Sequence, residues 1–349
     1  MDNNSGHVVL FDSISDLNDL DEVINEDMSK IISFNHDTHK LLKDKKISHE
    51  ISDAYLSEKE LRMIQKTAYS ISEWFNAEEI SKYLSYKGVN IGSLVQDELI
   101  NILVNYIKKF FELYKISKKV NCTTYVGSYA CCEIMKNFSK TITTFKNSKK
   151  EVLGQLPLDS NEIKMKIGTK DHSMKFGISK NLFKKLKSIS EKSTKLLLPK
   201  NNLAKETSQN VLIVEFNAIQ YQSFFEQMPN SHLNFLTYNR RRPTFWNFQS
   251  YNLVKQSGCF VETEDSLSDT NLKKIISNGK LETEKQISNL LSEEVFFQSF
   301  FSIHGISFWF AFKPFFQEFL RKRALEFIHE IELFKKLLEK YTFSSVLIL

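Results

Sequence analysis

Residues 211–246 carry the clearest hydrophobic pattern in the chain. Val211–Val214 is a short apolar run rich in β-branched residues, which predicts a strand buried on both faces. Residues 219–228 place their aromatic side chains on one side of a predicted helix, which ends at Pro229-Asn230. Leu233–Leu236 predicts a second strand. A strand–helix–strand unit of this kind is typical of a parallel α/β sheet.

Polar residues follow both of these strands. Ligands of open α/β sheets bind just outside the carboxyl ends of the strands, so these residues are candidates for substrate binding. The candidate set is Asn217, Tyr221, Asn239, Arg240, Arg241 and Arg242. Three consecutive arginines favour an anion site, most plausibly for phosphate. The alternative is that the arginines form a solvated surface patch and that Asn217 and Tyr221 only cap and face a helix.

The N-terminal part repeats the same pattern. Strands are predicted at residues 7–12, 30–34, 47–51 and 123–126, with helical segments between them. Ser57 with Glu60 fits a capping box that opens a helix running to about residue 75. Residues 95–113 carry an apolar stripe with spacings of three and four residues, which predicts the longest clear helix of this part. The order of elements predicts a Rossmann-like α/β unit.

Charge separates a connector from these α/β units. The net charge is +5, but residues 146–205 hold 15 Lys, no Arg and 5 acidic residues, which is about +10 in that segment alone. The segment has few aromatic residues and no nucleic-acid motif, so we expect a solvated connector, with a short hairpin at 162–167 and 172–178, and no nucleic-acid partner.

The C-terminal part contains an apolar window, a long helix and a strand. Residues 295–312 are apolar but hold three Ser, a Gln and a His, which favours a buried or membrane-surface helix over a transmembrane span. An apolar stripe predicts a helix over 315–338, and residues 344–349 predict a strand. Because parallel strands normally lead into a crossover helix, we expect this strand to open a further domain and the chain to be part of a longer protein.

Cysteine usage, the N-terminus and the absence of common motifs limit the classes of protein and site that the sequence can represent. The four cysteines form no CxxC pair, and the N-terminus resembles no signal peptide, so a cytoplasmic protein is expected. No GxGxxG, P-loop, GxSxG or HExxH motif is present, and we expect no cofactor. His36 and His39 lack a clear third ligand, and Asp19-Leu20-Asp21 lies in an acidic helix, so no metal site is predicted.

A family resemblance rests on three stretches. They are KIISFNHDTHKLLK with HEISDAYLSEKEL at 30–61, YKGVNIGSLVQDELINILVNYIKKFFELY at 86–114, and VLIVEFNAIQYQSFFEQM with LNFLTYNRRRPTFWN at 211–247. In combination they resemble the N-terminal half of the GT-B-type glycosyltransferases that build surface carbohydrates. The resemblance implies Rossmann-like parallel sheets flanked by helices, a nucleotide-sugar donor and a glycan acceptor.

The resemblance also suggests residue roles. GT-B enzymes typically meet the departing phosphate with Arg, Lys or helix N-termini, and a carboxylate or His deprotonates the acceptor hydroxyl. Glu215 is the candidate base, His36 and Asp12 are reserve candidates, and Arg240–Arg242 would contact phosphate. A non-catalytic carbohydrate- or partner-binding α/β module is the alternative. The expected organisation has four parts: an α/β unit at 1–145, a connector at 146–210, a second α/β unit at 211–314, and the start of another domain at 315–349. We also expect peripheral membrane association through residues 295–312.

Overall fold

The fold is that of a computed structural model of the chain. It describes residues 6–16, 19, 23, 30–120, 122–148, 160–166, 173–179, 185–189, 209–245, 247–303 and 305–348. The chain divides into two compact units. Unit 1 comprises residues 1–156 and 282–327, and unit 2 comprises residues 157–281 and 328–349.

Unit 1 is built on a parallel sheet of five strands in the order β3-β2-β1-β6-β7. The strands are β1 (His7–Phe11), β2 (Lys30–Ser33), β3 (Glu50–Ile51), β6 (Thr124–Gly127) and β7 (Thr141–Thr144). The predicted strands at 7–12, 30–34 and 123–126 are confirmed as neighbours in this sheet. β7 has alternating exposed and half-buried Thr and Ile residues and was not predicted, because it lacks the buried run that marks the central strands.

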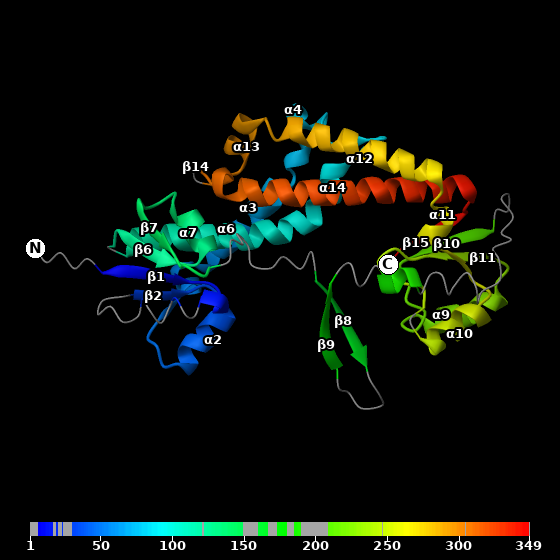
Figure 1. Cartoon of the computed structure of the whole chain (residues 1–349), viewed down its shortest axis with the longest axis horizontal. Coiled ribbons are helices and arrows are strands. Elements are labelled where there is room, and N and C mark those ends of the chain that lie inside the picture. The colour runs from blue at the N-terminus through cyan, green and yellow to red at the C-terminus, as the bar shows by residue number, and fades with distance from the viewer. Residues whose placement is uncertain are drawn as a thin grey trace, which may run out of the picture. The chain divides into compact units, whose positions relative to one another are not determined.

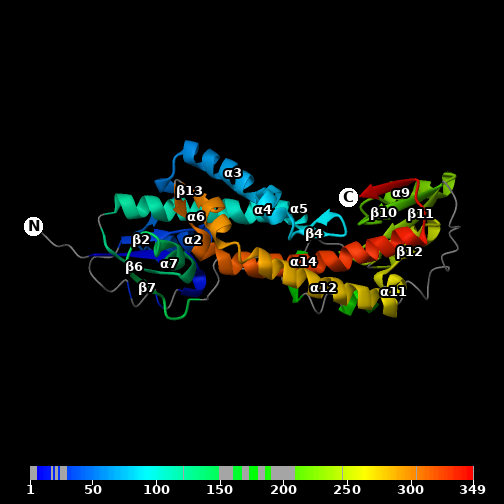
Figure 2. The same ribbon diagram turned by 90° about the horizontal axis from the view of Figure 1, so that it is seen from above.

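Helices cover both faces of this sheet. Val9, Phe11, Ile31 and Leu42 form one core cluster beneath the strands, and Figure 1 shows α2 on that side and α6 and α7 on the other. The helices and turns of this part are η1 (Ile14–Asp16), α2 (His36–Asp44), η2 (Ser52–Tyr55), α3 (Glu58–Ser72), η3 (Trp74–Asn76), α4 (Glu78–Ser81), α5 (Ile91–Leu94), α6 (Gln96–Lys119) and α7 (Tyr129–Met135), with a small hairpin of β4 (Ser85–Tyr86) and β5 (Val89–Asn90). The predicted capping box at Ser57 and Glu60 is confirmed, and α3 lies along α6 in Figure 2.

The apolar window 295–312 is not one helix, which corrects the sequence-based expectation. It forms α13 (Glu294–Phe300), a hairpin of β13 (Ser302–Ile303) and β14 (Ile306–Ser307), and the start of α14 (Trp309–Lys340). The chain turns at Gly305, whose φ of +76° favours glycine. The compact turn lets Phe297, Phe301 and Trp309 pack together in a buried aromatic cluster, with Phe297 and Trp309 stacked at 4.5 Å. Among the described residues, no helix has the length and apolar character that crossing a bilayer requires.

Unit 2 is built on a second parallel sheet, in the order β12-β11-β10-β15. Its strands are β10 (Asn210–Val214), β11 (Asn234–Tyr238), β12 (Phe260–Glu262) and β15 (Ser345–Ile348). Val211, Ile213 and Phe225 belong to the core on the face covered by α9 (Gln222–Gln227) and α10 (Phe248–Gln256). Leu212 and Leu236 pack on the other face with residues of α11 (Glu264–Leu267), α12 (Thr270–Leu290) and α14. The prediction that 211–214 is a strand buried on both faces is confirmed.

β15 was expected to begin the sheet of a further domain, but it belongs to the sheet of unit 2. It pairs in parallel with β10, with Leu212 opposite Val346 and Val214 opposite Ile348. Its four residues are nevertheless exposed, including Ile348 at 71%. β15 therefore holds a place beside the central strand of unit 2 but lies at the edge of the sheet among the described residues.

The units divide the chain differently from the boundaries expected from sequence. Residues 282–327 join the N-terminal unit, and residues 328–349 join the unit that contains β10. The connector contains the predicted hairpin, formed by β8 (Ser160–Lys166) and β9 (Ser173–Ser179) in antiparallel pairing. Both units thus have α/β folds with parallel sheets, and in both the first strand lies between the second and a later strand.

Candidate functional site

Three polar segments directly follow β10, β11 and β12, and they lie together at the end of the unit 2 sheet where these parallel strands have their carboxyl ends. We call this end the carboxyl edge of the sheet. Glu215 follows β10, residues 239–242 follow β11, and residues 263–265 follow β12. The strand order reverses between β10 and β15, because β11 and β12 were added on the other side of β10. Such a switch point is where ligands of open α/β sheets bind.

Glu215 organises the turn after β11. Its backbone has a φ of +64°, which a non-glycine residue rarely adopts. Its Oε1 accepts hydrogen bonds from the backbone N–H groups of Arg240 and Arg241, at 2.6 and 2.9 Å. Its Oε2 is buried without a hydrogen bond and lies 3.9 Å from Nε of Arg242. The carboxylate proposed as a base is therefore bonded to the neighbouring turn.

We call residues Asn239–Pro243 the arginine turn. Asn239 is buried and donates from Nδ2 to the Phe216 carbonyl at 2.9 Å, which joins the turn to the end of β10. Arg240 forms an ion pair with Glu330 of α14. Arg241 is exposed and Arg242 is partly exposed, at 38% of its side chain. The structure thus separates the three arginines: Arg240 is held by Glu330, Arg242 lies beside Glu215 and is partly exposed, and Arg241 is exposed.

Asn217 and Tyr221 take up local structural roles. The Asn217 side chain accepts a hydrogen bond from the N–H of Ile219 at 3.1 Å, which forms an Asx turn ahead of α9. The Tyr221 ring packs on Phe216 with centroids 5.1 Å apart. The packing of Tyr221 corresponds to the alternative that the sequence left open, whereas Asn217 closes a turn and does not cap α9.

Asp12 and His36 belong to unit 1, at the carboxyl edge of its sheet. Asp12 forms an ion pair with Lys109 at 2.5 Å, and its N–H donates to Ser128 Oγ. His36 is the first residue of α2 and is exposed. His39 is paired with His49 at 2.9 Å, and the described residues contain no group of three or more potential metal ligands.

The unit 1 edge is filled by its own side chains. Asp16 is fully buried and accepts a hydrogen bond from Ser128 Oγ, while Asp19 accepts from the N–H and side chain of Asn147. Burial raises the pKa of Asp16, although hydrogen bonds from Ser128 and Ser148 lower it. Because these polar groups satisfy one another, the unit 2 edge is the better candidate for a bound ligand.

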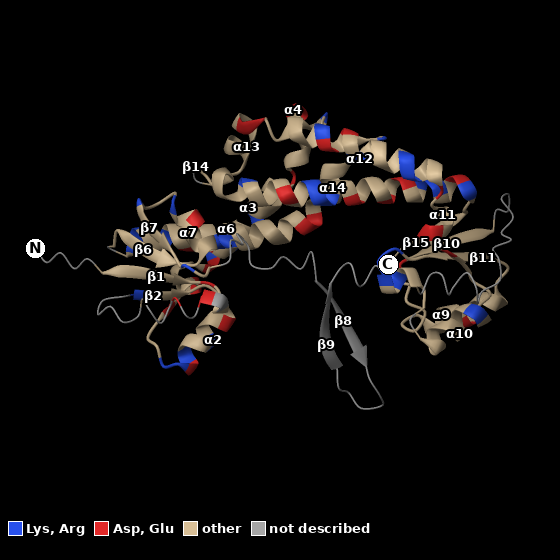
Figure 3. Cartoon of the chain, in the orientation of Figure 1, with Lys and Arg blue, Asp and Glu red and all other residues tan. Residues whose placement is uncertain are grey.

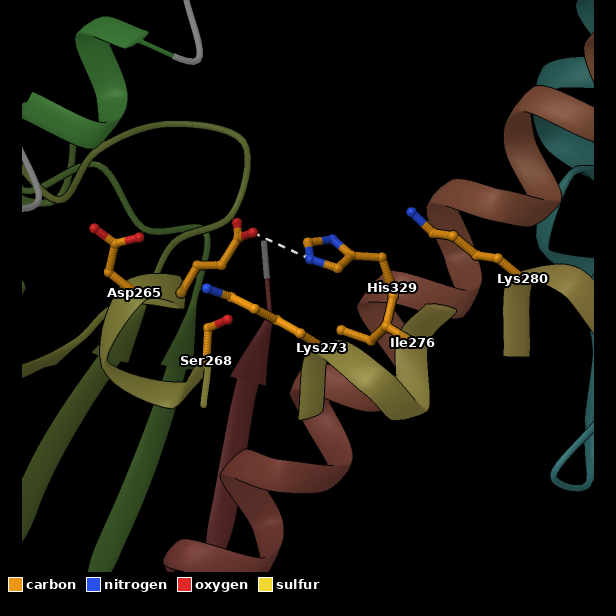
Figure 4. Close-up of a pocket in the computed structure, with 7 residues that line it drawn as sticks. Asp265, Ser268, Lys273, Ile276, Lys280 and His329 are labelled. Atoms are coloured by element: carbon orange, nitrogen blue, oxygen red, sulfur yellow. Dashed lines mark ion pairs between the residues drawn. The ribbon is translucent and has the colours of Figure 1, made fainter. Parts of the chain in front are cut away.

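A pocket of about 390 Å³ lies in unit 2, beside the end of β12 (Figure 4). It is lined by Glu264, Asp265, Ser268, Lys273, Ile276, Lys280 and His329. His329 Nε2 lies 3.1 Å from Glu264 Oε1. The next residue of α14, Glu330, pairs with Arg240, so adjacent residues of one helix contact the pocket and the arginine turn. This volume suits a small-molecule ligand.

Sequence reasoning missed the pocket residues. The polar residues 263–265 directly follow the short strand β12, so their position relative to a strand end matches that of the arginine turn. His329 carried no comparable signal, because its role depends on how α14 packs on the sheet. Comparison with known proteins found no matching family model, no similar curated protein and no similar solved structure.

Proposed function

We propose that the chain belongs to a glycosyltransferase of surface polysaccharide or glycan biosynthesis. It would use a nucleotide-sugar donor and a glycan acceptor, and the carboxyl edge of the unit 2 sheet would hold the phosphates. The observation that carries this proposal is the arginine turn: two solvent-reaching guanidinium groups, Arg241 and Arg242, at the carboxyl end of β11, next to the strand β10 that borders the switch point.

The chemistry of glycosyl transfer supports this choice. Negative charge develops on the departing phosphate, and preorganised donors aimed at that charge lower the barrier. Arginine offers a planar set of N–H donors that matches phosphate oxygens in pairs. Glu215 fixes the backbone of the arginine turn through two hydrogen bonds, so the guanidinium groups start from an ordered backbone.

The proposed base remains one of three residues. Glu215 would have to release the N–H groups of the arginine turn before it could accept a proton. Asp12 is paired with Lys109, and His36 has an exposed imidazole. Glu215 is the one of the three that belongs to the same unit as the arginine turn.

A non-catalytic carbohydrate- or partner-binding module is the second candidate. It is favoured by the engagement of Glu215 and Arg240 in structural contacts. The discriminating measurement is sugar release or transfer from a nucleotide-sugar, which a module binds without turnover.

The test of the site is calorimetric titration of the full chain with a nucleoside diphosphate and with nucleotide-sugars. Arg241→Ala and Arg242→Ala should each weaken binding by about tenfold, as expected for loss of a charge-assisted hydrogen bond. Arg321→Ala, an exposed arginine of α14 outside the site, is the control. Equal affinity in all three variants would reject the arginine turn as a phosphate site.

Peripheral membrane association at the cytoplasmic face is a further part of the proposal. Val295 and Phe310 are 83% and 66% exposed, although Phe297 and Trp309 in the same segment are fully buried. Vesicle flotation of the chain should depend on both side chains, and replacing each with Ser should abolish it. Flotation that survives the double replacement would refute this contact.

A further inference from the structure

The pocket beside β12 collects charged groups that have no charged partner. Among the described residues, Lys273, Lys280 and Asp265 make no ion pair within 4 Å, and Ser268 Oγ makes no hydrogen bond. All of them line the pocket, and Figure 4 shows Lys273 and Ser268 near the ion pair of His329, with Lys280 on one side and Asp265 on the other. Pockets with a few convergent polar groups are the usual sites of small ligands.

Two lysines of α14 in unit 2 are paired. Lys336 lies 3.3 Å from Asp269, and Lys340 lies 2.6 Å from Glu262. Figure 3 shows that Lys and Arg recur along α12 and α14, so basic residues alone do not distinguish the pocket. Its distinguishing property is that Lys273, Lys280 and Asp265 line the same pocket without an ion pair among the described residues.

The positive and the negative side chains of the pocket would bind different groups of a ligand. Lysine ammonium groups donate hydrogen bonds and attract an anion, whereas carboxylates accept hydrogen bonds from hydroxyl groups. Lys273 and Lys280 project from α12, with Ile276 between them in sequence and buried at 8% exposure. Ile276 therefore supplies an apolar surface among these polar groups.

We propose that this pocket binds a monosaccharide that carries an anionic group, either a phosphate or a carboxylate. Lys273 and Lys280 contact the anion, Asp265 and Ser268 contact ring hydroxyls, and Ile276 contacts the apolar face of the ring. This site goes beyond the proposed function, because it is separate from the arginine turn and stands whether or not the chain transfers sugars.

His329 offers a hydrogen-bond acceptor to a hydroxyl group of the ligand. When Nε2 carries the proton and its N–H donates a hydrogen bond to Glu264, Nδ1 is free of a proton and can accept a hydrogen bond. Glu264 thus acts as a positioning residue that fixes the tautomer and orientation of the imidazole. The bound sugar is expected to donate one hydroxyl hydrogen to Nδ1.

The experiment is titration of the full chain, followed by NMR and calorimetry, with four probes. These are glucose 6-phosphate, glucuronate, glucose and inorganic phosphate. The two anionic sugars are compared to find which anion is bound, and either one binding more tightly than both glucose and phosphate supports the proposal. Equal binding of inorganic phosphate and the anionic sugars would overturn it, as would no binding of either anionic sugar.

Variants assign the binding to the pocket. Lys273→Gln and Lys280→Gln should each lower the affinity for the anionic sugar about tenfold, while Lys274→Gln, an exposed lysine of α12 outside the pocket, should leave it unchanged. Arg241→Ala should weaken nucleotide binding without affecting this ligand, so failure of one site is distinguishable from failure of the other. Loss of affinity in the Lys274→Gln control equal to that in the pocket variants would overturn the assignment.

Discussion

Glu112 is a buried carboxyl in α6 whose ionisation should lower the stability of unit 1, and its replacement tests this directly. The side chain is 2% exposed. Ser52 Oγ donates to its Oε1 at 3.1 Å, and Lys108 Nζ lies at 3.5 Å. Burial raises the pKa of Glu112 to about 7 from 4.5, although the charge of Lys108 lowers it. Lys108 has a closer partner in Asp53, at 2.5 Å.

The sign of the pH dependence follows from this raised pKa. Between pH 4.5 and 7 the folded state keeps its proton while the unfolded state has lost it, so stability falls as pH rises through this window. One pKa unit corresponds to about 1.36 kcal/mol, so the loss approaches roughly 3 kcal/mol above pH 7. Glu112→Gln keeps an acceptor for Ser52 without the charge. The variant should therefore gain roughly 2–3 kcal/mol at pH 8 and less than about 1 kcal/mol at pH 5.

The assay is thermal unfolding of both proteins at pH 5 and pH 8. A gain of this size corresponds to a rise in Tm of about 4–12 °C for a domain of this size. Glu60→Gln is the control, because hydrogen bonds from Lys115 and Ser57 lower the pKa of Glu60 to about 2, and its ionised form is stabilising above pH 4.5. That variant should lose stability at pH 8. A Glu112→Gln variant that is less stable than the parent at pH 8 would refute the reasoning.

Three further predictions concern the backbone and the sheet edge. Gly127→Ala should destabilise unit 1 by about 1–3 kcal/mol in a thermal melt, because a Cβ at Gly127 would collide with the Leu10 carbonyl; an unchanged Tm would contradict this. Glu215→Gly should be less destabilising than Glu215→Ala, because glycine tolerates a φ of +64°, and both should lose the two hydrogen bonds to the arginine turn; chemical denaturation ranks them. Leu347→Lys should reduce self-association at the exposed β15 edge, measured by light scattering after size exclusion, and a parent chain that is monomeric at all concentrations would refute this.

The sequence predicted the strands that lie at the centres of the sheets. Val8–Phe11 and Val211–Val214 are almost fully buried, and burial on both faces leaves a continuous apolar run that can be recognised without a structure. β7 was missed because an edge strand needs no such run. The apolar window 295–312 was misassigned because its hydrophobicity indicates only that the segment is buried. Its division into two helices depends on the turn at Gly305.

The candidate site was predicted in part for a similar reason. Strand ends mark positions along the chain, so the arginine turn could be found from residues 233–243 alone. Which arginine stays available depends on Glu330, which lies some ninety positions away and contacts Arg240 only through the packing of α14. The pocket depends on the same packing, because His329 comes from α14 while Lys273 comes from α12. Local sequence patterns therefore could not predict these contacts, which join elements that lie far apart in the sequence.

The pairing of β10 with β15 has a consequence for synthesis on the ribosome. Ser344, just before β15, bonds to Asn210 at the start of β10, 134 residues earlier. At about 5–20 residues per second, translation needs roughly 7–27 s to cover this interval. During that time β11 and β12 can join β10 on one side, while its other side lacks the strand that will complete it. The nascent chain thus carries an open Val-Leu-Ile-Val strand for far longer than a β-hairpin takes to form, and this is the period in which a chaperone would matter most to the chain.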